Sequence, residues 1–261
     1  MESFAEYILN EEDLFSKMEI TYYLAQKTGI FFDKSVVFKT ELARMFMDYM
    51  NIDVDRNLVL TACVLCNCKK IENAQDIEKI QAYAKNGADY LRNLGFSSRF
   101  CKVCEEINRY SNSNPRERES DILELVDQFG GMLLDRPERI GLNIDEALVL
   151  LEHRNLKDQY NRYLYTFEEF IKLMESIELN DIAYIKSLKL LIKIYRESGN
   201  VKNFIKNVCN EYEPKIDEAM MKHDTDIKNE MLQKSNRPLF SEETTRKILA
   251  HIANQNEENN I

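Results

Sequence analysis

The spacing of apolar residues between Ser120 and Arg139 predicts a helix with one broad apolar face. Apolar residues recur there at intervals of three and four positions, as expected for a helix packed in a core. They are Ile122, Leu123, Leu125, Val126, Phe129, Met132 and Leu133. Asp127 falls among them. Burying a carboxylate is costly unless it meets a metal ion, a cation or several hydrogen-bond donors, so Asp127 is the first candidate functional residue.

The same segment contains two features that shape its end. Gly130 and Gly131 allow another backbone to approach closely, or allow the helix to bend. Pro137 disfavours helical geometry at Arg136, so the helix is expected to end there. Arg136 and Arg139 leave two guanidinium groups near this end.

Apolar periodicity predicts helices along the rest of the chain as well. They are expected over 11–29, 36–50, 55–68, 76–94, 98–110, 180–198, 201–212, 215–234 and 241–253, with another starting at 143. Residues 112–119 are polar and predict a loop, and no segment alternates as a strand would. The expected fold is therefore all-α, with an N-terminal helix in 1–34 packing on a helical domain over 35–178.

Residues 179–261 are expected to form a C-terminal helical extension. Its amphipathic helices could fold back on the core or pair with a protein partner or a second copy of the chain, and both alternatives stay open. The last eight residues, 254–261, are too polar to pack and should fray.

Composition excludes several classes of protein. The 261 residues include only 7 Gly and 4 Pro, which favours long helices with few tight turns. A net charge of −10 argues against a nucleic-acid surface, which needs clustered Lys and Arg. There is no apolar run long enough to span a membrane and no signal-peptide layout. The six cysteines are then expected to be free thiols in a cytoplasmic protein.

Asp127 followed by Arg136-Pro137-Glu138-Arg139 resembles the corresponding region of HD-GYP domains, a branch of the HD metal-dependent phosphohydrolases. The resemblance extends over about 35–170 and implies an HD-domain-like helical bundle. In that family, His and Asp side chains hold divalent metal ions. The metals activate water and neutralise the phosphoryl group under attack.

The first two metal-binding positions are replaced in this chain. Residues 65–71, with the sequence Leu-Cys-Asn-Cys-Lys-Lys-Ile, resemble the family's Leu-His-Asp-Ile-Gly-Lys-Ile segment. Cys66 stands at the His and Asn67 at the Asp, whereas Lys70 keeps the family's lysine. The upstream His of the family falls near Ser35.

Further family ligands are replaced downstream. Tyr83 stands where residues 83–88 resemble the family's His-Pro-x-x-Gly-Ala. Glu105 and Glu106 occupy the position of a His pair, and Pro115 alone remains of the Gly-Tyr-Pro triplet. An unperturbed tyrosine has a pKa near 10 and stays protonated at neutral pH. The resemblance therefore implies a scaffold that has lost its metal-binding side chains.

Two metal sites could be built from other residues. Glu105, Glu106 and Asp127 could hold Mg²⁺, Mn²⁺ or iron, although adjacent helical residues face different ways. Five cysteines could hold Zn²⁺ as thiolates, although Cys is also a common small core residue. They are Cys63, Cys66, Cys68, Cys101 and Cys104. In both cases the structural interpretation is favoured, so no metal cofactor is expected.

A ligand could also bind without being hydrolysed. Lys70, Arg136 and Arg139 match positions near the phosphate-binding region of the family, so they could hold a nucleotide or a cyclic dinucleotide. Alternatively, they neutralise Asp127 or lie on a solvated face. The sequence thus predicts a catalytically degenerate HD-GYP-like protein with a regulatory, ligand-sensing or scaffolding role. The alternative is a metal-dependent phosphodiesterase, acting on a cyclic dinucleotide of the cyclic di-GMP type or on another phosphoester through a site rebuilt around Asp127.

Overall fold

The computed structural model describes residues 3–50, 54–70, 77–107, 115–135, 140–155, 161–176 and 188–208. Within these ranges every regular element is a helix, which confirms the all-α class. The helices are α1 (Phe4–Asn10), α2 (Leu14–Thr28), α3 (Lys34–Met50), α4 (Arg56–Leu65), α5 (Ile77–Asn93), α6 (Ser98–Glu105), α7 (Arg118–Leu133), α8 (Ile144–Asn155), α9 (Leu164–Ser176), α10 (Leu188–Glu197) and α11 (Val201–Asn207).

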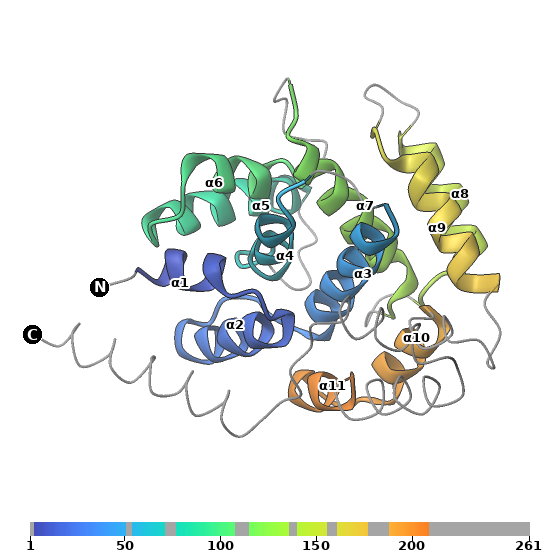
Figure 1. Ribbon diagram of the computed structural model, residues 1–261, viewed down its shortest axis with the longest axis horizontal. Coiled ribbons are helices and arrows are strands. Elements are labelled where there is room, and N and C mark those ends of the chain that lie inside the picture. The colour runs from blue at the N-terminus through green and yellow to red at the C-terminus, as the bar shows by residue number, and fades with distance from the viewer. Residues whose placement is uncertain are drawn as a thin grey trace, which may run out of the picture.

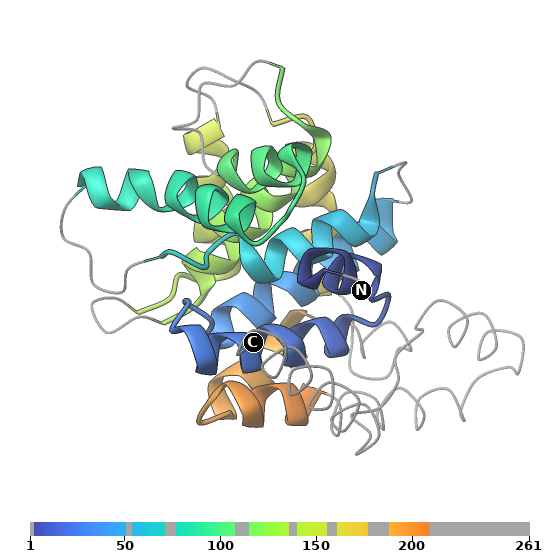
Figure 2. The same ribbon diagram turned by 90° about the vertical axis from the view of Figure 1, so that its left-hand side faces the viewer.

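Three helices form the centre of the molecule. Helix α3 packs on both α4 and α7, and α4 also packs on α7. Helices α5 and α6 lie together beside α4, whereas α8 and α9 lie on the other side of the centre, against α7 and α3 (Figures 1 and 2). Every residue of α4 from Leu58 to Leu65 is buried, because this segment is apolar nearly all round.

The N-terminal region contains two helices, of which the sequence predicted one. Helix α1 is short, but it begins with a capping box: the Ser3 hydroxyl accepts from the Glu6 N–H, and the Glu6 carboxylate accepts from the Ser3 N–H. The fully buried Lys17 of α2 then ties α1 to α4. Its Nζ donates to the carbonyl of Ile8 at 2.5 Å and to the hydroxyl of Thr61 at 2.9 Å.

Helices α10 and α11 dock on α3 of the same chain. Lys34 Nζ donates to the carbonyls of Ser198 and Tyr195 at 2.6 and 3.2 Å. The Tyr195 ring packs edge-on against Phe38 and Phe204, with centroid distances of 5.8 and 5.6 Å. For residues 188–208 the extension therefore folds back on the core. The helices predicted over 215–234 and 241–253 and the tail 254–261 lie outside the described residues.

Helices α4, α6 and α7 end earlier than the sequence predicted, α6 at Glu105 instead of 110. Helix α7 ends at Leu133, before Arg136, because the returning chain supplies a cap: the Leu142 N–H donates to the carbonyl of Met132 at 2.8 Å. Gly141 makes this return possible, since a Cβ there would overlap the Leu133 carbonyl oxygen. Helix α4 ends at Leu65, and residues 66–70 form a turn closed by hydrogen bonds from Cys68 N to Leu65 O and from Lys70 N to Asn67 O.

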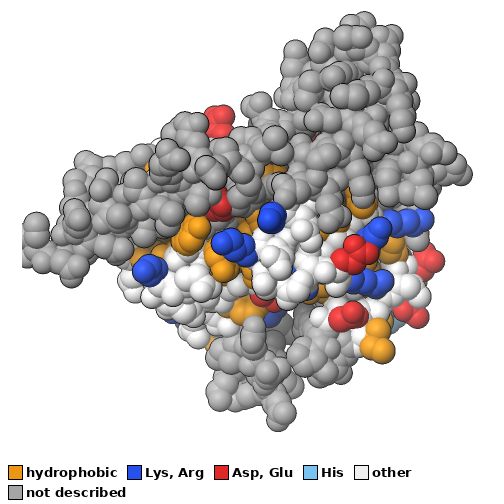
Figure 3. Space-filling view, turned by 90° about the horizontal axis from the view of Figure 1, so that it is seen from below, with side chains coloured by type: hydrophobic (Ala, Val, Ile, Leu, Met, Phe, Trp, Pro, Cys, Tyr) orange, Lys and Arg blue, Asp and Glu red, His pale blue; other side chains and the backbone are white. Residues whose placement is uncertain are grey.

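The surface of the described residues shows no large area of one type on the face in Figure 3. Positive, negative and apolar side chains are interspersed there. None of the described helices is both long enough and apolar enough to cross a membrane.

Candidate functional site

Helices α3 and α7 and the turn after α4 bring Lys39, Asn67 and Asp127 together. Lys39 Nζ lies 2.6 Å from Asp127 Oδ1. The Asn67 side-chain amide donates to the same oxygen at 3.2 Å. The side chain of Lys39 is 5% exposed and that of Asp127 is 20% exposed, so the ion pair is largely shielded from water. The carboxylate that the sequence singled out is thus partly buried and meets a cation from the chain itself.

Gly130 lets the lysine reach the carboxylate. It lies on α7 one turn after Asp127, and a Cβ at this position would come within 2.8 Å of Lys39 Cγ. The aliphatic part of the lysine therefore lies against bare backbone. The sequence led us to expect another backbone at the glycine pair, but the neighbour at Gly130 is a side chain of α3.

Electrostatics favour the ionised form of Asp127. Burial alone would raise the pKa of this carboxyl group, but the ammonium groups of Lys39 and Lys70 and the hydrogen bonds from Lys39 and Asn67 lower it to about 2. Asn67 contributes an amide donor where an aspartate would bring a second negative charge. Its Oδ1 is buried and has no hydrogen-bond partner among the described residues.

The candidate position near Ser35 is used for helix capping. The Ser35 hydroxyl donates to the Asp33 carboxylate at 2.5 Å, and the same carboxylate accepts from the backbone N–H groups of Ser35 and Val36. Ser35 stands one turn before Lys39 on α3. Lys39 is thus the side chain of α3 that reaches Asp127, and the sequence interpretation missed it.

The carboxylates of Glu106 and Asp127 do not converge. Glu106 is buried and accepts from the Ser120 hydroxyl at 2.6 Å and from the Glu117 N–H at 3.0 Å. Ser120 precedes Asp127 by seven residues of α7, which is about 10 Å along a helix. Glu105, the last residue of α6, is partly exposed.

All five described cysteines are buried free thiols. Burial raises the pKa of Cys66 and Cys104 well above the ordinary value and that of Cys68 to about 11. The Cys66 thiol donates to the Cys63 carbonyl with an Sγ to O distance of 3.7 Å. Zinc binds the thiolate form, which burial disfavours here. In the described part of the chain, no three His, Cys, Asp or Glu side chains group as a metal site would need.

The segment with Tyr83 serves packing. The Tyr83 ring is partly buried against the core. Gly87 brings α5 against the turn after α4, because a Cβ there would lie 3.3 Å from the Cys66 carbonyl oxygen and 3.5 Å from Cys68 Sγ.

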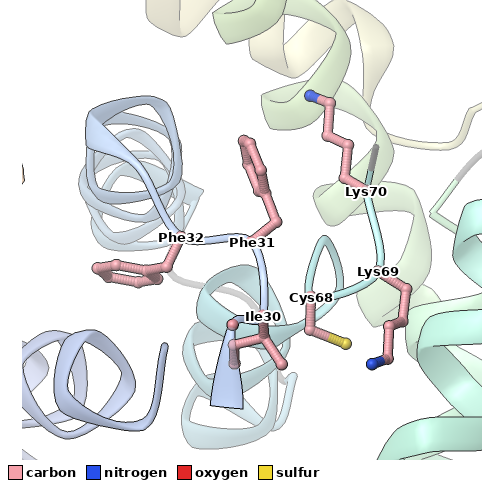
Figure 4. A pocket seen from close by; sticks show the side chains of 7 residues that line it. Ile30, Phe31, Phe32, Cys68, Lys69 and Lys70 are labelled. Atoms are coloured by element: carbon pink, nitrogen blue, oxygen red, sulfur yellow. The ribbon is translucent and has the colours of Figure 1, made fainter. Parts of the chain in front are cut away.

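Lys70 lines a recess with a volume of about 470 Å³ between the end of α2 and the turn after α4 (Figure 4). Its walls are Gly29, Ile30, Phe31, Phe32, Cys68, Lys69 and Lys70. Lys70 Nζ lies 5.4 Å from the centroid of the Phe31 ring. The other two predicted ligand-binding residues, Arg136 and Arg139, lie outside the described residues.

A second buried polar cluster, at the start of α7, was also missed from the sequence. Arg116 lies 3.1 Å from Asp121 and 3.5 Å from Glu124. Arg162 lies 2.7 Å from Asp121, and the Asn161 side chain donates to Glu124 at 3.0 Å. The cluster joins α7 to the segment before α9. The sequence does show acidic residues on the apolar face of a helix. It does not show which distant residues pair with them.

Comparisons of the chain with protein-family models, curated proteins and solved structures gave no match. The HD-GYP resemblance therefore rests on the residue pattern alone.

Proposed function

We propose that this chain is a non-catalytic, HD-GYP-like module with a regulatory or scaffolding role. The observation that supports the proposal is the position of Lys39 Nζ, 2.6 Å from the carboxylate of Asp127. Asp127 is the one residue that resembles a retained metal ligand of the family. A fixed ammonium group there supplies the positive charge that a metal would otherwise bring.

The neighbouring substitutions agree with this proposal. Asn67 donates a hydrogen bond to Asp127 where a second carboxylate would be repelled by it. The thiol of Cys66 is kept protonated by burial, and it is a weak donor where an imidazole would offer a lone pair. Lys39 and Asn67 stabilise a single, partly buried carboxylate, and Cys66 bonds the Cys63 carbonyl instead. They do not supply the several ligands that activation of water requires.

Metal content and hydrolysis test the proposal together. We expect untagged protein to carry less than about a tenth of an equivalent of divalent metal, since the native site is already neutralised. We also expect no cleavage of bis(p-nitrophenyl) phosphate or of cyclic di-GMP with added Mn²⁺. The Asp127→Ala variant is the matched control. Stoichiometric metal or turnover that disappears in this variant would establish the phosphodiesterase alternative and overturn our proposal.

A gain-of-ligand variant makes the experiment sharper. Lys39→Ala combined with Cys66→His and Asn67→Asp removes the internal cation and restores imidazole and carboxylate ligands. If Lys39 stands in for a metal, this triple variant should retain more Mn²⁺ than the wild type. Equal metal content in a folded triple variant would contradict that role for Lys39.

A further inference from the structure

Positive charge is concentrated on α10 and α11. Residues 188–208 contain five cationic side chains and one acidic side chain, and all six are exposed. They are Lys189, Lys193, Arg196, Lys202 and Lys206, with Glu197 as the acid. Since this range contributes +4 to a chain whose net charge is −10, the other residues together carry −14. The two helices are thus a basic part of an otherwise acidic chain.

Four of these cations form two short rows that face away from α3. Lys193 and Arg196 are three positions apart on α10, and Lys202 and Lys206 are four positions apart on α11, so each pair lies on one side of its helix. The other side of each helix packs on α3, at the edge of the molecule (Figure 1). Its buried residues are Leu188, Leu191 and Ile194 on α10 and Phe204 and Ile205 on α11. We call Lys193, Arg196, Lys202 and Lys206 the basic face.

The helix pair presents these charges on a fixed backbone. The Asn207 side chain donates to the Ser198 hydroxyl at 3.0 Å, which joins α11 to the turn after α10. The Asn200 side chain accepts from the N–H of Asn203 at 2.9 Å at the start of α11. On the opposite side, Lys34 of α3 donates to the carbonyl of Ser198 at 2.6 Å. A surface that is already ordered loses little conformational entropy when a partner binds.

Ion pairs within the chain leave most of the basic face available. In the described ranges, Arg196, Lys202 and Lys206 form no ion pair. Lys193 lies 3.9 Å from Glu197, and the two side chains are 60% and 56% exposed. An exposed ion pair of this kind contributes little to stability. An acidic partner can therefore pair with these cations without breaking a strong contact.

The surroundings of the basic face favour a short acidic partner. An extended polyanion such as nucleic acid would also cover the neighbouring surface, which carries both signs on the face in Figure 3 and belongs to an acidic chain. A helix that binds in the plane of a membrane needs exposed apolar side chains, whereas those of α10 and α11 are largely buried against the core. A second copy that used the same face would place like charges opposite each other.

We propose that the basic face binds a short acidic helix of another protein. Glutamates three and four positions apart on such a helix match the spacing of the cations on α10 and α11, so several charge pairs can form at once. The inference rests on the proposed regulatory or scaffolding function, and it names the chemistry of the partner.

Fluorescence anisotropy of labelled synthetic peptides, titrated with the full chain, tests the proposal. The probe is an alanine-based helix of about 20 residues with glutamates three and four positions apart on one side. The control peptide has glutamine at the same positions. The glutamate peptide should bind with a dissociation constant below about 1 mM in about 50 mM salt. It should bind at least about fivefold more weakly in about 500 mM salt, and the glutamine peptide should not bind.

Charge neutralisation separates the basic face from the charge of the whole chain. The triple variant Arg196→Gln, Lys202→Gln and Lys206→Gln should weaken binding of the glutamate peptide by about tenfold or more, because three charge pairs are lost. The matched control neutralises three exposed cations on α5, α7 and α8, namely Lys85→Gln, Arg118→Gln and Arg154→Gln. It changes the net charge by the same amount and should bind within about twofold of the wild type. Circular dichroism establishes that both variants are folded.

Four results would overturn the proposal. They are no binding of the glutamate peptide up to about 10 mM, equal weakening in the two triple variants, tighter binding of phosphatidylserine vesicles or of a single-stranded oligonucleotide than of the peptide, and self-association of the chain that the basic-face variant abolishes. The metal content and turnover of the same protein test the proposed function separately. Bound metal or hydrolysis would contradict that function, while the peptide affinities still decide the basic face.

Discussion

Replacing Lys39 with methionine tests how strongly the internal cation supports the buried carboxylate. Methionine has nearly the same length and fills the space against Gly130, but it leaves Asp127 without its ammonium partner. The lowering of the Asp127 pKa from 3.8 to about 2 corresponds to about 2 kcal/mol of stability, at 1.36 kcal/mol per pKa unit. Asp127 is only partly buried and keeps Lys70 and Asn67 beside it in this variant, so a loss of about 2–3 kcal/mol is expected near pH 7, below the range for a fully buried pair.

The assay is urea unfolding followed by far-ultraviolet circular dichroism, in which the midpoint should fall with an unchanged m-value. The ion pair also determines the direction in which stability changes with pH. In the wild type the folded pKa of Asp127 is depressed, so its contribution is present above about pH 4 and is lost as the pH falls towards 2. Without Lys39, burial should raise that pKa, and stability should then be lost as the pH rises through it.

The difference in the free energy of unfolding between wild type and Lys39→Met should therefore become smaller as the pH falls from about 7 to about 3. Lys193→Met on the exposed face of α10 should leave the unfolding midpoint unchanged. Lys39→Met with Asp127→Leu removes both charges, and it should recover most of the loss. A loss below about 1 kcal/mol for the single variant, or a gap that does not depend on pH, would refute the reasoning.

Three further predictions concern the core. Gly130→Ala should cost about 1–3 kcal/mol in urea unfolding because its Cβ meets the Lys39 side chain, whereas Gly199→Ala, with open space around it, should cost less than about 1 kcal/mol; equal costs would contradict this account. Burial lowers the pKa of Lys17 from 10.5 to about 8, so the unfolded state binds more protons between these pH values. The free energy of unfolding of wild type relative to Lys17→Met should therefore rise by up to about 3 kcal/mol from pH 8 to pH 10.5. A difference that does not change with pH would show that Lys17 does not titrate there. The five described thiols should react with a thiol reagent only after unfolding, as mass spectrometry of labelled peptides can show, because all are buried; rapid labelling of the native protein would contradict their burial.

Much of the fold could be predicted from local sequence signals. Helix α2 lies within the predicted segment and ends at Thr28 with Gly29 as its C-cap, and α3 ends at Met50 as expected. The reciprocal bonds between Asn143 and Glu146 before α8 also match the capping pattern in the sequence. These features depend on residues three or four positions apart, which is the range over which a helix repeats. Helix α1 was missed because its seven residues are too few to establish a period.

The candidate site depended on contacts that a sequence does not reveal. Asp127 could be singled out because it is a carboxylate on an apolar helix face. Its partner, Lys39, lies 88 positions away and has no local signal that separates it from a solvated lysine. The docking of Lys34 on the carbonyl of Ser198, across 164 positions, likewise decided between folding back and pairing in trans for residues 188–208. Local periodicity determined which faces are buried, whereas only the tertiary structure decided which charge meets which, because ion pairing depends on distances in space.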